Sequence, residues 1–290
     1  MASPRFIVPV RRGSARPLCL VHSVAGELTW MPHLAGALAA GQPLYGFAAA
    51  GLNADAPFFS SLPEMAAAYL RDLRELQPQG PYMIGGYSMG GVVAYEMACQ
   101  LQACGEEVAL LALIDAFAPH PQRAESICRW SRNGLLMQVV ANQLALQWGA
   151  SVLMQPEVLA STPYSGHSAV AASHLLAHTG TRHTFGSLQP YLRRCQTLMR
   201  VHAELLSAYR PQRLHQPVPA LLFRATLGLI GRDSALKLPV LPLAQRAPPH
   251  GWESLLARCD TIDIAQEHFL MSGAEPMAEI AAALDRRLRA

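Results

Sequence analysis

A serine, an aspartate and a histidine follow one another along this chain in surroundings that suit acyl transfer. Ser88 follows an apolar run, residues 82–86, and precedes a helix-like run, residues 92–99. Asp115 comes directly after the next apolar run, and His268 follows the last one. A serine hydroxyl becomes a nucleophile when a base takes its proton and an acid orients that base. These residue types therefore indicate a serine nucleophile, provided that the fold brings them together.

The residues around Ser88 have the pattern of a sharp strand-to-helix turn. Gly86 and Gly90 flank the serine at positions where a Cβ would collide with the strand or the helix. Such a turn strains the serine backbone, exposes the hydroxyl and aims helix N–H groups at developing negative charge. An ordinary glycine-rich turn can carry the same five-residue match, but the strand before it and the helix after it favour a nucleophile.

Asp115 and His268 are selected by their positions at predicted strand ends, where the reactive groups of open α/β sheets gather. Asp263 is the rival acid, but it lies inside the predicted last strand, where a structural carboxylate explains it better. The order serine, aspartate, histidine is that of the α/β-hydrolase topology. Most other histidines fall in the middle of the chain and are expected to be solvated or packing residues: His167, His174, His178, His183 and His202.

An oxyanion hole needs two N–H donors, one of them on the residue after the nucleophile, which is Met89. The other is expected from the loop at residues 22–26, which follows an early apolar strand. Val24 and Ala25 are both candidates for this second donor. His22 lies close to the site but precedes the nucleophile, so we expect it to shape the oxyanion loop and not to act as the base.

Composition narrows the class of protein. The chain has 290 residues, of which 51% are hydrophobic and 15% charged, with a net charge of +3. These values suit one large α/β domain and do not suggest nucleic acid binding. No apolar run reaches the roughly 18 residues that span a bilayer, and the start of the chain lacks a signal-peptide core. The six cysteines are scattered without a C-x-x-C pair, so neither a metal site nor a disulfide framework is expected. We therefore expect a cytoplasmic protein without membrane contact.

Strand-like and helix-like runs alternate at both ends of the chain, which predicts a mostly parallel, doubly wound sheet. Residues 6–10 suit an edge strand because prolines flank them. The pattern changes over residues 117–209, where helical stretches at 135–149 and 188–209 flank a polar connection at 161–184. We expect a single domain, residues 1–290, with residues 117–209 inserted at one edge of the sheet as a helical lid.

Several segments, taken in this order, resemble the thioesterase domains of nonribosomal peptide synthetases and polyketide synthases and their free-standing relatives. The matching segments are residues 17–26, 80–82, 85–91, 112–115, 219–225, 251–252 and 268–271. They cover both ends of the chain and leave out the middle, as a variable lid would. The resemblance implies an α/β-hydrolase fold.

The resemblance also implies a mechanism. Ser88 would accept an acyl or peptidyl chain from the phosphopantetheine thiol of an acyl or peptidyl carrier protein, without a cofactor of its own. Asp115 and His268 would complete the triad, and Val24 and Met89 would supply the oxyanion donors. Hydrolysis or macrocyclisation would then release the product. The chain departs from the family pattern at Ser23, where a proline is common, and at Gln266-Glu267, where a glycine usually stands two residues before the histidine.

Two other interpretations remain open. The same triad could serve an esterase or acyltransferase acting on small-molecule esters, although the late Gly251-Trp252 segment favours the thioesterase. A hydrolase-fold protein without catalytic activity could instead bind a ligand, although all three triad residue types are present.

Overall fold

Seven strands form one sheet in the computed structural model, which describes residues 6–52, 58–231, 233–236, 238 and 250–288. In chain order they are β1 (Ile7–Arg11), β2 (Leu18–Val21), β3 (Leu44–Phe47), β4 (Tyr82–Tyr87), β5 (Val108–Ile114), β6 (Ala220–Ala225) and β7 (Asp260–Ile264). Across the sheet the order is β1-β3-β2-β4-β5-β6-β7, and every neighbouring pair is parallel except β1 with β3. The mostly parallel sheet is confirmed, with the first strand at its edge.

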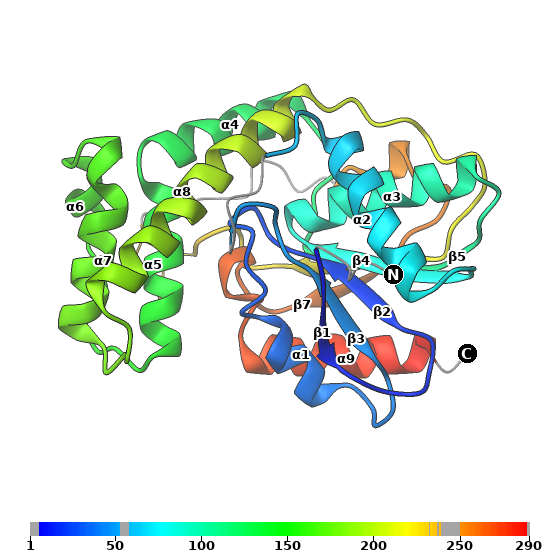
Figure 1. Ribbon diagram of the computed structural model, residues 1–290, viewed down its shortest axis with the longest axis horizontal. Coiled ribbons are helices and arrows are strands. Elements are labelled where there is room, and N and C mark those ends of the chain that lie inside the picture. Colours follow the sequence, from blue (N-terminus) through cyan, green and yellow to red (C-terminus); the bar gives the residue numbers. More distant parts are fainter. Residues whose placement is uncertain (1–5, 53–57, 232, 237, 239–249, 289–290) are drawn as a thin grey trace.

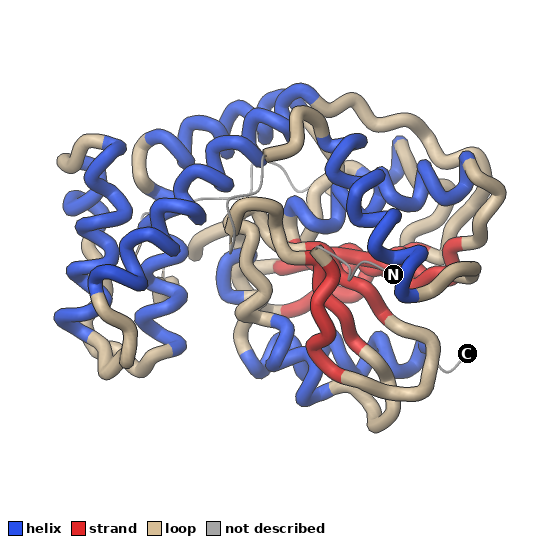
Figure 2. Tube along the Cα trace, in the orientation of Figure 1, coloured by secondary structure: helices blue, strands red, loops and turns tan. Residues whose placement is uncertain are grey.

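Helices cover both faces of the sheet (Figures 1 and 2). α2 (Leu62–Leu76) and α3 (Met89–Ala103) pack on one face, where their apolar side chains join those of the strands in one core cluster. α1 (Met31–Ala37) and α9 (Ala274–Leu288) share a second cluster with the opposite face. β2 and β4 are buried at every residue, as strands covered on both sides must be. This is the doubly wound α/β-hydrolase arrangement.

Five helices connect β5 to β6 and gather on one side of the sheet (Figure 1). They are α4 (Pro121–Arg132), α5 (Leu135–Gln147), α6 (Pro156–Ala160), α7 (His167–His178) and α8 (Phe185–Ala208). A separate apolar cluster holds α5 and α7 against the first half of α8. The far end of α8 reaches the main core, where Leu205 and Leu206 pack beside α3. α8 therefore links the helical region to the sheet.

The helical region differs from its prediction in one respect. The expected polar connection at 161–184 contains α7, which buries Ala171, Ala172 and Leu175 against its neighbours. The histidines and serines of α7 interrupt its apolar pattern in the sequence. The burial of its apolar face is evident only from its packing against α5 and α8. The region connects β5 to β6, which pair with each other inside the sheet.

Candidate active site

Ser88 lies on the turn between β4 and α3 with a backbone φ of +56°, a value that residues other than glycine rarely adopt. The turn is this tight because its neighbours carry no side chains. A Cβ on Gly86 would lie 2.2 Å from the carbonyl carbon of Gly90, and one on Gly90 would lie 2.4 Å from the carbonyl oxygen of Val21. Both glycines are therefore required sterically, and they hold the serine at the carboxyl end of the sheet.

The structure brings Ser88, His268 and Asp115 into one hydrogen-bonded series. Ser88 Oγ lies 3.0 Å from His268 Nε2, and His268 Nδ1 lies 2.7 Å from Asp115 Oδ2. An ionised carboxylate only accepts hydrogen bonds, so Nδ1 carries the ring proton of a neutral His268. Nε2 is then the unprotonated nitrogen, which accepts a hydrogen bond from the hydroxyl of Ser88. This geometry suits a general base acting on a hydroxyl nucleophile.

Asp115 is buried at the end of β5 and is held there by several donors. Its Oδ1 accepts hydrogen bonds from Ala225 N at 2.7 Å and from His250 Nε2 at 2.8 Å. Burial alone would raise the pKa of this carboxyl, but hydrogen bonds from His250 and His268 outweigh it and lower the pKa to about 2. The carboxylate is therefore ionised near neutral pH, where it accepts the hydrogen bond from His268 Nδ1.

The rival acid Asp263 lies in another environment. Its carboxylate accepts two hydrogen bonds from Arg224, at 2.7 and 2.8 Å, and its side chain is 52% exposed. The hydrogen bond from Arg224 lowers the pKa of this carboxyl. Asp263 is thus half of a surface ion pair, which matches the structural interpretation made from its position inside a strand.

The loop after β2 lines the same pocket as Ser88, and its main chain is held in a tight turn. Gly26 N donates to Ser23 O at 3.0 Å, and Ala25 N donates to Ser23 Oγ at 3.4 Å. Ser23 Oγ in turn donates to Glu27 Oε1 at 2.8 Å. Val24 lies in this turn and lines the same pocket as Ser88 and His268. Met89 begins α3, and its side chain lies in the core beside α2.

Two buried histidines form hydrogen bonds with the main chain of this loop. His22 Nδ1 donates to Ser23 O at 2.6 Å, and its Nε2 accepts from Tyr69 Oη at 2.7 Å. His202, on α8, stacks on His22 with ring centroids 5.1 Å apart and donates from Nδ1 to Val24 O at 2.8 Å. Burial lowers the pKa of His22 to about 3 and that of His202 to about 4. Both rings are therefore neutral. His22 shapes the loop as expected, and His202 is a packing residue that also ties α8 to the loop.

The turn that carries His268 is braced from two sides. Tyr87, the residue before the nucleophile, donates from its hydroxyl to the carbonyl of His268. Gln143, on α5, donates from Nε2 to the carbonyl of Phe269. Burial raises the pKa of Tyr87 well above its ordinary value, so its hydroxyl remains a donor. The helical region thus contacts both the loop after β2 and the turn of His268.

A narrow pocket leads to Ser88 and His268 beneath α5. Six residues of α5 line it, Leu136, Val139, Val140, Gln143, Leu144 and Gln147. Their spacing places them on one face of the helix. The opposite wall includes Val24, Phe269 and Met199, and polar groups come from Glu27 and Thr29. Its volume is about 40 Å³, roughly three times the 10–15 Å³ that one water molecule requires.

The described part of the chain holds no group of three histidine, cysteine, aspartate or glutamate side chains that could bind a metal ion. Within the same residues, no helix has the length and apolarity to cross a membrane.

One functional neighbour was missed by sequence reasoning. His250 hydrogen-bonds Asp115 from 135 residues further along the chain. Its position directly before Gly251-Trp252, a segment already set apart by its resemblance, was the available signal.

The comparisons with known proteins agree with this arrangement. A family model described as thioesterase domain matches residues 16–162, about half of the chain. Atromentin synthetase of Tapinella panuoides is 42% identical over 115 residues, which are 39% of this chain and 12% of that protein. The chain thus corresponds to a small part of this curated relative's length.

Two solved structures share the fold. One is a holo four-domain nonribosomal peptide synthetase, AB3403, bound to AMP and glycine (TM-score 0.75, 24% identity, 98% of this chain and 20% of that one). The other is the NocB thioesterase domain in covalent complex with a fluorophosphonate nocardicin G analogue (TM-score 0.61, 21% identity, 98% and 100%). The sheet, the helical region and the sequence match lead to the same conclusion, that this chain belongs to the thioesterase domain family.

Proposed function

We propose that this thioesterase-family protein cleaves acyl thioesters through a covalent intermediate on Ser88, with His268 as base and Asp115 as its orienting acid. The observation that carries the proposal is the series of two hydrogen bonds, 3.0 Å from Ser88 to His268 and 2.7 Å from His268 to Asp115. The positive φ of Ser88 supports it, because strained backbone at a nucleophile is characteristic of functional sites.

The reaction follows from the proton positions. Ser88 Oγ attacks the thioester carbonyl while His268 Nε2 takes the hydroxyl proton, and the main-chain N–H groups of Val24 and Met89 hold the resulting oxyanion. Ala25 N donates to Ser23 Oγ, which favours Val24 over Ala25 as the loop donor. The C–S bond then breaks, and the leaving sulfur takes the proton from His268. Water, or a nucleophile within the acyl chain, repeats the sequence in the second half and releases the product.

Residues 117–209 would form the lid. The face of α5 that covers Ser88 is mainly apolar, which suits an acyl chain. The pocket is narrow, with a volume of about 40 Å³, so we propose that α5 moves outward when the substrate enters. The hydrogen bond from Gln143, on α5, to Phe269 O would break in that movement. Substrate entry would then affect the turn that carries His268.

The substrate would be delivered by a carrier protein. The matching curated relatives are synthetases many times longer than this chain, which suits a thioesterase that works beside other domains. We propose release of an acyl or peptidyl chain from a carrier-bound phosphopantetheine thioester in polyketide or nonribosomal peptide biosynthesis. Hydrolysis and macrocyclisation share the same first half of the reaction.

A competition between leaving groups tests this function. One acyl chain is presented three ways: on the phosphopantetheine of a carrier protein, on free pantetheine, and as an alkyl ester. Release is followed by free thiol for the first two and by product mass for all three. We expect turnover of both thioesters, fastest from the carrier, and little from the ester, and all of it lost in Ser88→Ala. Faster turnover of the alkyl ester would contradict a thioesterase, and equal turnover of both thioesters would contradict carrier delivery.

A further inference from the structure

His250 stands out because it shares two features with the proposed triad. Among the described residues, the non-glycine residues with positive φ are Ser88 (+56°), Asp115 (+41°) and His250 (+58°). Two of the three belong to the proposed triad, and such strain persists only where the surrounding structure enforces it. His250 is also buried and in direct hydrogen-bond contact with Asp115.

Contacts at both the ring and the main chain hold His250 in place. Its ring stacks on Phe117, with centroids 4.1 Å apart and planes 23° apart. Its main-chain carbonyl accepts hydrogen bonds from Ala118 N at 3.0 Å and from Arg123 Nη1 at 3.2 Å. Two residues further on, Trp252 donates from Nε1 to Ala116 O at 2.8 Å. Residues 250–252 are thus hydrogen-bonded to the segment that follows Asp115, and these contacts restrict the movement of the His250 ring.

Donors occupy both oxygens of the Asp115 carboxylate. Oδ2 faces His268, while Oδ1 accepts from His250 Nε2 at 2.8 Å and from Ala225 N at 2.7 Å. A carboxylate with donors on both oxygens cannot rotate about its Cβ–Cγ bond without losing charge-assisted hydrogen bonds. His250 adds a second donor to Oδ1, beside Ala225 N, and so strengthens the restraint that directs Oδ2 at the base.

We propose that His250 is a positioning residue of the thioesterase site, whose Nε2–H holds the Asp115 carboxylate in place and moderates its negative charge. The inference rests on the proposed triad and adds a fourth member that does not touch the substrate. Removing the N–H would loosen the carboxylate and strengthen its hold on the proton of His268. The base would then stay protonated to higher pH.

Charged groups of both signs surround His250. The guanidinium of Arg123 donates to the main-chain carbonyl of His250 at 3.2 Å and lies 4.9 Å from the centroid of the Phe117 ring. The titratable groups that face this cluster are Asp115, His268, Arg123, Glu253, Arg224 and Asp263. Because an ionised carboxylate only accepts, the nitrogen that faces it must carry the ring proton.

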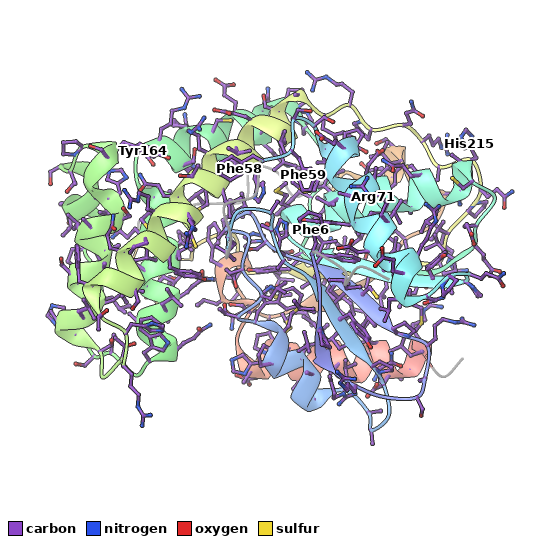
Figure 3. All side chains as sticks on the ribbon, viewed as in Figure 1. Phe6, Phe58, Phe59, Arg71, Tyr164 and His215 are labelled. Carbon is purple, nitrogen blue, oxygen red and sulfur yellow. The ribbon has the colours of Figure 1, made fainter. Side chains whose placement is uncertain are left out.

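The test compares two substitutions at this position. His250→Phe keeps a ring to stack on Phe117 and removes the donor, whereas His250→Gln places an amide N–H near the position of Nε2. The readout is the rate at which a fluorophosphonate probe labels Ser88, followed by intact mass from about pH 5 to 9, the range that covers a histidine titration. His215→Gln is the control, since His215 is exposed on the loop after α8, far from α5–α7 (Figure 3).

We expect His250→Phe to label about 10-fold more slowly at neutral pH, as for loss of one charge-assisted hydrogen bond, and its acid limb to move to higher pH. His250→Gln should label within about threefold of wild type, because the donor is retained. A His250→Phe protein with the wild-type rate and acid limb would overturn the proposal. So would a His250→Gln protein as slow as His250→Phe, because a donor placed near Nε2 would then restore nothing.

A second measurement keeps the proposal testable if His250→Phe does not fold. In the wild-type protein labelled with ¹⁵N-histidine, His250 should carry a proton on Nε2 at neutral pH, assigned by the absence of its signals in His250→Gln. An Nδ1–H tautomer, with no proton on Nε2, would overturn the inference. Failure of the proposed function is distinct: the probe would then leave wild-type Ser88 unlabelled, while the tautomer of His250 would still be read.

Discussion

His202 Nδ1 donates a hydrogen bond to the carbonyl oxygen of Val24, 2.8 Å away, and so joins α8 to the loop after β2. The two residues lie 178 positions apart in the sequence. Because the N–H of Val24 is a proposed oxyanion donor, the carbonyl of the same residue is fixed by a helix of the proposed lid. The position of α8 therefore bears directly on the geometry in which the oxyanion would be held.

The stacked pair His22 and His202 should make the fold sensitive to acid. Their folded-state pKa values, about 3 and about 4, lie below the ordinary value of 6.5, because burial disfavours the charged ring. Above that ordinary value both states are neutral and stability does not depend on them. As pH falls below it, the unfolded state binds protons that the folded state cannot, so each ring destabilises the fold by about 1.4 kcal/mol per pH unit until its own folded pKa is reached.

His202→Asn isolates this effect, because its amide can still donate to Val24 O but does not titrate. Urea unfolding at several pH values should give a shallower acid dependence for the variant than for the wild type between about pH 6 and 4. Parallel curves would show that His202 is protonated in the folded state or exposed to solvent.

The choice of acid is tested by two matched substitutions. Asp115→Asn should slow turnover by about 10⁴-fold, because an amide stabilises neither the correct tautomer nor the positive charge on His268. Asp263→Asn should leave turnover within about twofold, since it loses one exposed ion pair. Circular dichroism would establish that both proteins fold. The reverse order of effects would assign the acid to Asp263.

The turn around Ser88 should not tolerate a methyl group at Gly86. A Cβ there would lie 2.2 Å from the main-chain carbon of Gly90, so the backbone must shift. We expect Gly86→Ala to lower the free energy of unfolding by about 2 kcal/mol or more, measured in urea. Gly36→Ala is the control: it lies inside α1, meets no atom within 4 Å, and should raise stability by about 0.5–1 kcal/mol. Equal stability of Gly86→Ala and wild type would contradict the tight turn.

The face of α5 should set the length of acyl chain that is accepted. Val140→Trp adds an indole to the pocket wall and should slow acylation by long chains while sparing acetyl donors. Leu146→Trp puts the same side chain on the exposed face of α5 and should change neither. A series of acyl-pantetheines from two carbons upward measures the effect. Equal loss for all chain lengths would mean that Val140 supports the catalytic groups and does not bound the chain.

The sequence predicted the sheet and the positions of Ser88, Asp115 and His268 because those signals are local. Strands buried on both faces must be apolar throughout, so the apolar runs at residues 18–21 and 108–114 could be predicted as strands. A polar residue directly after such a strand falls at the carboxyl edge of a parallel sheet, which located Asp115. The glycines around Ser88 marked its turn in the same way.

What the sequence did not predict depends on contacts between distant segments. The hydrogen bond from His250 to Asp115 and that from His202 to Val24 each cross more than 100 positions. His202 does not differ in its local pattern from the other histidines of the chain, and only the neighbouring Gly251-Trp252 segment sets His250 apart. α7 was missed for the same reason, because the burial of Ala171 and Leu175 becomes evident only beside α5 and α8.

The most direct test of the central claim is intact-protein mass spectrometry after brief mixing with an acyl-pantetheine thioester, with wild type beside Ser88→Ala. We expect the wild-type protein to gain the mass of one acyl group and then to lose it as product is released. We expect no gain in mass for Ser88→Ala. Product formation by Ser88→Ala at the wild-type rate, or an equal adduct on both proteins, would contradict Ser88 as the nucleophile.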